Sequence, residues 1–175
     1  MRLKGEKVIL RPLALSDAPR FVTWFNDPAV HRFLARRELT LQEERKWIRS
    51  LPKKKDGVHF AIDTREGVHI GSVGFNDINR KDNYAVFGIA IGDKRYWGKG
   101  YGTDAMKCII DYGFRTLRLH RIELEVYEYN VRGIKLYCRL GFKIEGEKRE
   151  RVYWKGKYYN TFQMAILRNE WQKAE

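Results

Sequence analysis

Cysteine is scarce in this sequence, and its scarcity excludes two kinds of site. The chain of 175 residues contains only Cys108 and Cys138, and neither stands at zinc-ligand spacing from another cysteine or a histidine. A disulfide framework and a zinc centre are therefore both excluded, and we expect no metal cofactor.

Long apolar runs are also missing. No run approaches the roughly eighteen residues that a membrane-spanning helix needs. Residues 1–7 (MRLKGEK) lack the apolar segment of a signal peptide. We therefore expect a cytoplasmic protein with no membrane contact.

Acidic residues are in deficit. Aspartate and glutamate total 22 against 35 lysines and arginines, which gives a formal net charge of +13. This surplus favours a polyanionic ligand or partner, such as phosphate groups, a nucleic acid or an acidic protein, and charge alone does not choose among them. The length and the balance of 43% hydrophobic with 33% charged residues predict one folded domain over residues 1–175.

Periodicity and capping signals predict a mixed α/β fold, with one central sheet and helices packed against it. The apolar run 84–91 predicts a strand covered on both faces, the most buried of the set. Thr40 and Glu43 form a capping-box pattern at the start of a helix. The expected helices cover residues 16–25, 40–51, 103–117 and 130–140, and the seven expected strands cover 7–13, 58–63, 68–75, 84–91, 121–129, 142–154 and 158–167.

A glycine-rich turn, residues 97–103, lies between a predicted strand and a predicted helix. Its glycines let the main chain approach a ligand closely, and the following helix N-terminus attracts anions. A Walker A loop is excluded because Gly100, rather than Ser or Thr, follows Lys99. A dinucleotide fingerprint is also a weak match, because its third glycine is missing. The turn therefore predicts a phosphate cradle of another type.

A second motif covers residues 130–142. Asn130 suits a helix N-cap, Gly133 allows close packing, and Tyr137 lies on the same helix face as Gly133. This segment resembles the Asn-x-x-Ala/Gly-x-x-x-Tyr-x-x-x-Gly-Phe motif of the GNAT superfamily of N-acetyltransferases. Residues 100–102 resemble the last three positions of that family's Gln/Arg-x-x-Gly-x-Gly/Ala loop, with Trp97 where Gln or Arg is usual.

The resemblance is to the branch that includes ribosomal-protein N-terminal and polyamine acetyltransferases. It implies a partly splayed sheet and acetyl-CoA as co-substrate, with main-chain groups near Ile89 and Ile91 binding the acetyl carbonyl. Tyr137 is then the acid that protonates the coenzyme A thiolate. The implied cofactor-binding residues are Ile89, Ile91, Trp97, Gly98, Lys99, Gly100, Tyr101, Gly102, Thr103, Asn130 and Arg132.

The general base is the least determined residue. Glu123 and Glu125 alternate onto one face of their predicted strand, and the resemblance points to Glu125, acting through water. The alternative is a solvated strand face whose carboxylates pair with Arg121 or Lys143.

The acceptor is expected to be a primary amine, and the sequence leaves its identity open among protein N-termini, polyamines, aminoglycosides and amino sugars. A succinyl donor is an open alternative to acetyl. A different class of function is a catalytically inactive GNAT-fold module that contacts RNA or the ribosome. A monomer and a homodimer paired through strands 142–154 and 158–167 are both open. The four histidines are expected at surface or edge positions.

Overall fold

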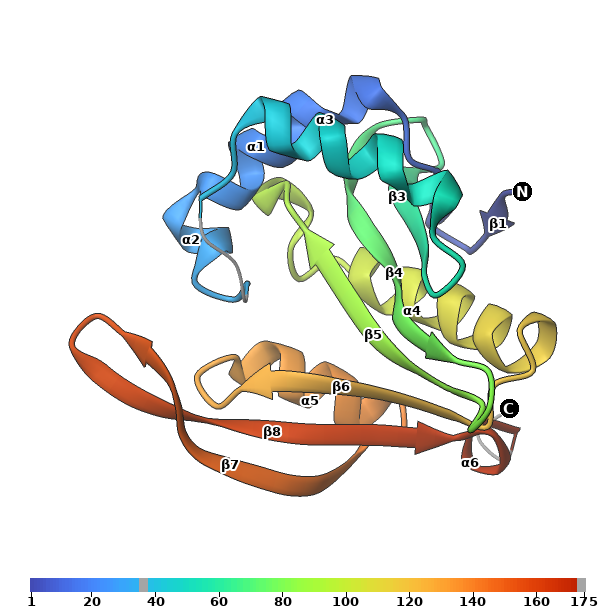
Figure 1. Cartoon of the computed structure of the whole chain (residues 1–175), viewed down its shortest axis with the longest axis vertical. Helices are drawn as coiled ribbons and strands as arrows, with labels where there is room; N and C mark the ends of the chain where they lie inside the picture. Colours follow the sequence, from blue (N-terminus) through green and yellow to red (C-terminus); the bar gives the residue numbers. More distant parts are fainter. Residues whose placement is uncertain (35–37, 173–175) are drawn as a thin grey trace.

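The computed structural model describes residues 1–34 and 38–172; residues 35–37 and 173–175 of the expected domain lie outside that description. The described residues form one eight-stranded sheet with the order β1-β2-β3-β4-β5-β6-β8-β7 (Figure 1). Among the described strands, only β5 and β6 pair in parallel. The predicted mixed sheet is confirmed, with β1 as an added strand. The strands are β1 (Leu3–Lys4), β2 (Val8–Pro12), β3 (Val58–Thr64), β4 (His69–Asn79), β5 (Tyr84–Ile91), β6 (Arg121–Tyr127), β7 (Lys143–Trp154) and β8 (Lys157–Leu167).

All four predicted helices are present, and two short helices, α2 and α6, were not predicted. The capping box forms as expected, because Thr40 Oγ1 accepts from Glu43 N at 3.2 Å and Glu43 Oε2 accepts from Thr40 N at 3.0 Å. No described helix has both the length and the apolar character to span a membrane. The helices are α1 (Ala18–Asn26), α2 (Pro28–His31), α3 (Leu41–Ser50), α4 (Tyr101–Asp111), α5 (Val131–Arg139) and α6 (Arg168–Gln172).

Helices cover both faces of the sheet. Successive strand residues point to opposite faces. His69 contacts Phe21 of α1, whereas its neighbour Ile70 belongs to the main core that also contains Met106 and Ile109 of α4. A smaller cluster joins α1 to α3. Helix α5 lies behind β6 in Figure 1, on the same side as α4.

The sheet splits between β5 and β6. Register pairs join Tyr84, Ala85 and Val86 to β6, and within the described residues none follows them. The two strands diverge from that point (Figure 1). The expectation that β5 is the most buried strand was therefore wrong. Residues 88–91 are only partly buried because they border the split, whereas β4 is buried along most of its length.

Candidate active site

The glycine-rich turn ends at the N-terminus of a helix that has no side-chain cap. Helix α4 begins at Tyr101, two residues before the predicted start, because Gly100 serves as the N-cap in the left-handed region at φ 87°. No side chain caps the helix, and Asp104 N makes a bond to Gly100 O at 3.0 Å. The first-turn amides before Asp104 therefore have no intrahelical acceptor, an arrangement that favours anions. Gly98 has φ 72°, which also favours glycine.

Asp104 and Lys7 border this site, and sequence reasoning missed both. The Asp104 carboxylate is buried and accepts from the amides of Glu6, Lys7 and Val8 at 3.1, 2.8 and 3.0 Å. This anchor holds the Lys7 side chain beside the turn. Lys7 Cε lies 3.5 Å from where a Cβ at Gly100 would stand. The sequence carries no local signal for this contact between segments far apart in the chain.

The end of β5 offers main-chain groups to the split. Gly92 N donates to Ile70 O of β4 at 2.9 Å, so alternate residues of β5 also face β4. The N–H and C=O groups of Ile89 and Ile91 therefore point the other way, toward the split. Trp97 Nε1 confirms this direction by donating to Ile91 O at 2.7 Å.

Helix α5 brings the second motif to the turn. Asn130 Oδ1 caps it by accepting from Gly133 N at 3.0 Å, and a Cβ at Gly133 would clash with the Asn130 amide. The cap places Arg132 in the first turn of α5, where its Cζ lies 5.2 Å from the Trp97 ring centre. The predicted cofactor residues Trp97, Asn130 and Arg132 are thus brought together, and Lys99 is exposed on the same turn.

Tyr137 lies on the inner side of α5. Its ring centre is 6.5 Å from that of Phe87 and 6.0 Å from that of Phe142, and burial raises its pKa to about 12. A Cβ at Gly102 would lie 3.7 Å from Ile91 Cγ1 and 3.9 Å from Leu136 Cδ2. The glycine-rich turn, the end of β5 and α5 therefore meet at one place, beside Ile91, Gly102 and Leu136, which we call the seam.

Glu125 lies on the other face of β6, away from the buried Leu124 and Val126. Its carboxylate accepts from Lys148 Nζ at 2.5 Å and from Gln163 Nε2 at 3.1 Å. Partial burial opposes ionisation, but these hydrogen bonds outweigh it and lower the pKa of Glu125. The carboxylate is thus ionised and paired at neutral pH.

The ion pairs proposed as an alternative to a catalytic base are partly present. Glu123 pairs with Arg121 at 2.7 Å, as that alternative predicted. Lys143 pairs with Glu170 instead, and the cation at Glu125 is Lys148. Both acidic residues of this β6 face are therefore paired, Glu123 with Arg121 of the same strand and Glu125 with Lys148.

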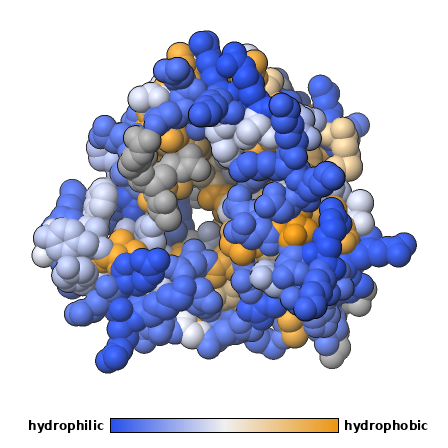
Figure 2. All heavy atoms as spheres, in the orientation of Figure 1, coloured by the Kyte–Doolittle hydropathy of each residue, from blue (hydrophilic) through white to orange (hydrophobic). Residues whose placement is uncertain are grey.

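The face shown in Figure 2 is hydrophilic over most of its area and hollowed near its centre, with hydrophobic residues in the walls of the hollow. One bond crosses from the segment after α2 to the segment after β6, where Tyr129 Oη donates to Arg32 O at 2.6 Å. The part of the molecule that contains α2 and the part that contains β6 therefore also touch at a place other than residues 84–86, where β5 pairs with β6.

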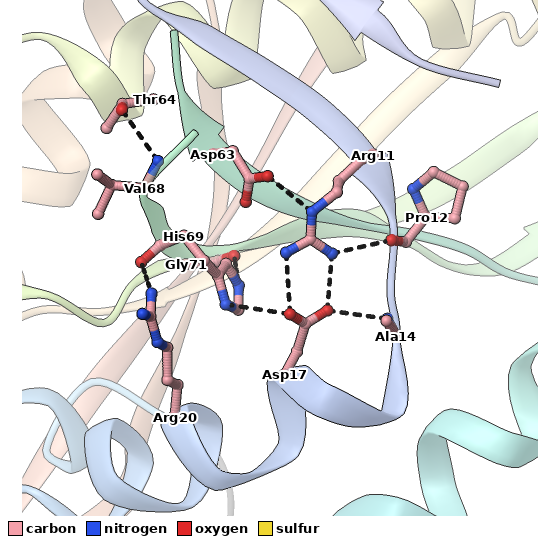
Figure 3. Close-up of polar contacts among 10 residues, drawn as sticks. All are labelled: Arg11, Pro12, Ala14, Asp17, Arg20, Asp63, Thr64, Val68, His69 and Gly71. Carbon is pink, nitrogen blue, oxygen red and sulfur yellow. Dashed lines mark hydrogen bonds and ion pairs between the residues drawn. The ribbon is translucent and has the colours of Figure 1, made fainter. Parts of the chain in front are cut away.

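A buried polar cluster lies between α1 and the sheet (Figure 3). Arg11 donates to both Asp17 oxygens at 2.8 and 2.9 Å and to Asp63 at 2.7 Å. His69 Nδ1 lies 3.4 Å from Asp17, and its Nε2 contacts Gly71 O at 3.0 Å. The expectation of surface or edge histidines was wrong for His69, which is buried where α1 packs on β4.

Comparison with known proteins agrees with the geometry. The profile of a family described as "Acetyltransferase (GNAT) domain" matches residues 7–143. The "Uncharacterized N-acetyltransferase p20" of Bacillus licheniformis is 31% identical over 174 residues, which are 97% of each chain. The spermidine N(1)-acetyltransferase of Escherichia coli K12 is 36% identical over 106 residues, 61% of this chain and 56% of the relative.

A solved structure has the same fold. The spermidine N-acetyltransferase of Vibrio cholerae, in complex with CoA and spermine, matches with a TM-score of 0.88 and 25% identity over 94% of this chain and 98% of that chain. The family match covers most of the chain, and both motifs lie where the fold requires them. The chain therefore belongs to the GNAT family of acetyltransferases and is an N-acetyltransferase.

Proposed function

We propose that residues 1–175 act as one domain that transfers an acetyl group from acetyl-CoA to a primary amine. One observation carries the proposal: the uncapped start of α4, the open edge of β5 and α5, the helix that carries Tyr137, border the same seam. The relatives named as spermidine acetyltransferases make spermidine and spermine the first acceptors to test.

The residues at the turn fit a diphosphate. Amides at an uncapped helix start attract anions, and the dipole of α4 adds to the attraction. The cations Lys99 and Arg132 flank these amides, and Gly98 and Gly100 leave the main chain accessible. When bound there, acetyl-CoA supplies an activated acyl thioester. The net charge of +13 favours such a polyanion.

The amides that bind the acetyl carbonyl would come from β5, on one side of the split, and the two groups that handle protons, Tyr137 of α5 and Glu125 of β6, from the other side. The amides of Ile89 and Ile91 face the seam and would donate to the acetyl carbonyl oxygen as negative charge develops on it. The Tyr137 hydroxyl would hold a proton for the departing sulfur. Glu125, on the opposite face of β6, would accept the proton of the acceptor ammonium through water. The acetyl group would then pass to the amine by direct attack in a ternary complex.

The test begins with calorimetry of acetyl-CoA binding and continues with a thiol-release assay. The acceptor panel contains spermidine, spermine, a peptide with a free N-terminus, an aminoglycoside and an amino sugar. We expect acetyl-CoA binding and turnover with a primary amine. Succinyl-CoA in place of acetyl-CoA tests the alternative donor. A chain that binds RNA with steep salt dependence and binds no acetyl-CoA would instead be the non-catalytic module.

A further inference from the structure

Trp97 departs from the family pattern, and its contacts explain what it does instead. A Gln or Arg at this position has side-chain N–H groups to spare for a ligand, whereas the Trp indole has one donor and no acceptor. That donor is already used, because Trp97 Nε1 donates to Ile91 O at 2.7 Å. The Trp97 side chain therefore has no donor left for a phosphate.

Arg132 lies where the missing donors are needed. Its guanidinium lies over the Trp97 ring, with Cζ 5.2 Å from the ring centre, and its Nη2 lies 3.4 Å from where a Cβ at Gly98 would stand. The guanidinium is exposed and makes no hydrogen bond or ion pair with any residue in the described part of the chain. A guanidinium held over an aromatic ring by a cation–π contact keeps its N–H groups available for a bidentate contact with phosphate.

We propose that Trp97 and Arg132 form a clasp at the glycine-rich turn, where acetyl-CoA would bind. In this clasp, Trp97 is a positioning residue and Arg132 binds the diphosphate of acetyl-CoA. The clasp rests on the proposed function and specifies how this chain replaces the usual side chain of the turn. The Trp97 ring holds Arg132 over Gly98, and the Trp97 N–H fixes the end of β5 where the amide of Ile91 faces the seam.

The two contacts of Trp97 can be separated by substitution. Trp97→Phe keeps a ring for Arg132 and removes the N–H to Ile91 O. We expect this variant to bind acetyl-CoA within about threefold of wild type and to lose turnover, because the β5 edge is no longer fixed. Trp97→Gln removes the ring and introduces the family's usual residue. Its acetyl-CoA affinity no longer depends on Arg132.

The deciding measurement is a double-mutant cycle on the dissociation constant of acetyl-CoA by calorimetry. Arg132→Gln should weaken binding by about tenfold in the wild-type background and by less than about threefold in the Trp97→Gln background. Arg139→Gln, which removes an exposed charge from the last turn of α5, is the matched control and should change binding by less than about twofold.

3′-Dephospho-CoA serves to locate the phosphate that Arg132 binds. The loss caused by Arg132→Gln should be the same for this ligand if the contact is to the diphosphate. A loss seen only with the 3′-phosphate present overturns the diphosphate assignment.

The outcomes separate the clasp from the proposed function. A wild-type chain that binds no acetyl-CoA overturns both. Wild-type binding with equal losses from Arg132→Gln in the two backgrounds overturns the clasp alone. If Trp97→Gln does not fold, Trp97→Phe takes its place in the cycle. Because a ring remains in Trp97→Phe, Arg132→Gln should still weaken acetyl-CoA binding by about tenfold in that background. A smaller loss of affinity contradicts the clasp.

Discussion

Burial sets the protonation state of Tyr137 before any substrate arrives. A phenol with a pKa of about 12 stays protonated throughout the neutral range and is ready to donate. We expect Tyr137→Phe to lower the turnover number by about ten- to ten-thousand-fold, the usual range for a general acid. The affinity for acetyl-CoA should change little, since the Phe87 and Phe142 contacts are kept.

The measurement pairs steady-state kinetics with calorimetry. Tyr112→Phe is the control. Tyr112 is also buried and has a raised pKa, but it packs against Phe60 and not against the residues of the seam. Unchanged turnover in Tyr137→Phe, or an equal loss in both variants, removes Tyr137 from the chemistry.

Glu125 is expected to act in its ionised form at every pH of interest. Its pKa is lowered, because hydrogen bonds from Lys148 and Gln163 outweigh the opposing effect of burial. Glu125 protonation therefore reduces activity only as the pH falls below the ordinary range of about 4.3. We expect Glu125→Gln to lower kcat/KM by about a hundredfold without moving an acidic limb that lies above pH 6.

A pH profile of kcat/KM tests this expectation, with Glu123→Gln as the matched control. Glu123 is paired with Arg121, and Glu123→Gln should lower kcat/KM by less than about threefold. If the two variants lose the same small factor, Glu125 is a structural partner of Lys148 and the base lies elsewhere.

Residues with a motif could be predicted, and residues defined by distant contacts could not. Tyr137, Asn130 and the three glycines of the turn follow from short patterns with a physical reason at each position. His69 offered no such pattern, because its burial depends on α1 folding over β4 and on Asp17 reaching its ring. Local periodicity carries no information about such a contact.

At the scale of elements, the start of α4 is fixed by the Asp104 carboxylate rather than by a side-chain cap. Asp104 accepts hydrogen bonds from the amides of Glu6 and Lys7, which precede β2, and of Val8, which begins it, and so joins α4 to the first strands. Asp104→Asn places an N–H donor among these amides. We expect it to lower the free energy of unfolding by about 1–3 kcal/mol, the cost of unsatisfied buried groups.

Urea denaturation of Asp104→Asn checks this cost against Asp111→Asn. Asp111 lies on the same helix and pairs with Arg115 at its more exposed end, so its loss should cost no more than about 1 kcal/mol. Equal costs would contradict a special role for the Asp104 anchor.

Element types were predictable where a local signal acts alone. Thr40 and Glu43 start α3 as predicted, because a capping box is local. The start of α4 was placed at Thr103 because Gly100 caps through its backbone conformation and leaves no side-chain signal. The burial of β5 was overestimated, because an apolar run does not show that the neighbouring strand departs after Val86.

The stability of the whole molecule should depend on the buried cluster around His69. Burial lowers the pKa of His69 below its ordinary value of about 6.5. The unfolded chain then binds a proton at pH values where the folded chain does not. The stabilisation is present above pH 6.5 and is lost as the pH falls below it.

Urea midpoints at about pH 7.5 and pH 5.5 test this dependence. The wild type should lose stability at the lower pH, and His69→Gln should lose less, because it cannot be protonated. His120→Gln removes an exposed histidine and should behave as the wild type does. A pH dependence that persists unchanged in His69→Gln assigns it to other groups.

The short run of pairs between β5 and β6 leaves the sheet as two wings joined at one corner. Each wing is held together by its own antiparallel ladders, and the wings are linked at that corner and again by the hydrogen bond from Tyr129 to Arg32 O. A ligand in the angle between the two wings would contact both of them. Because such a ligand would bind the folded arrangement and not the unfolded chain, it would stabilise the two wings together against unfolding.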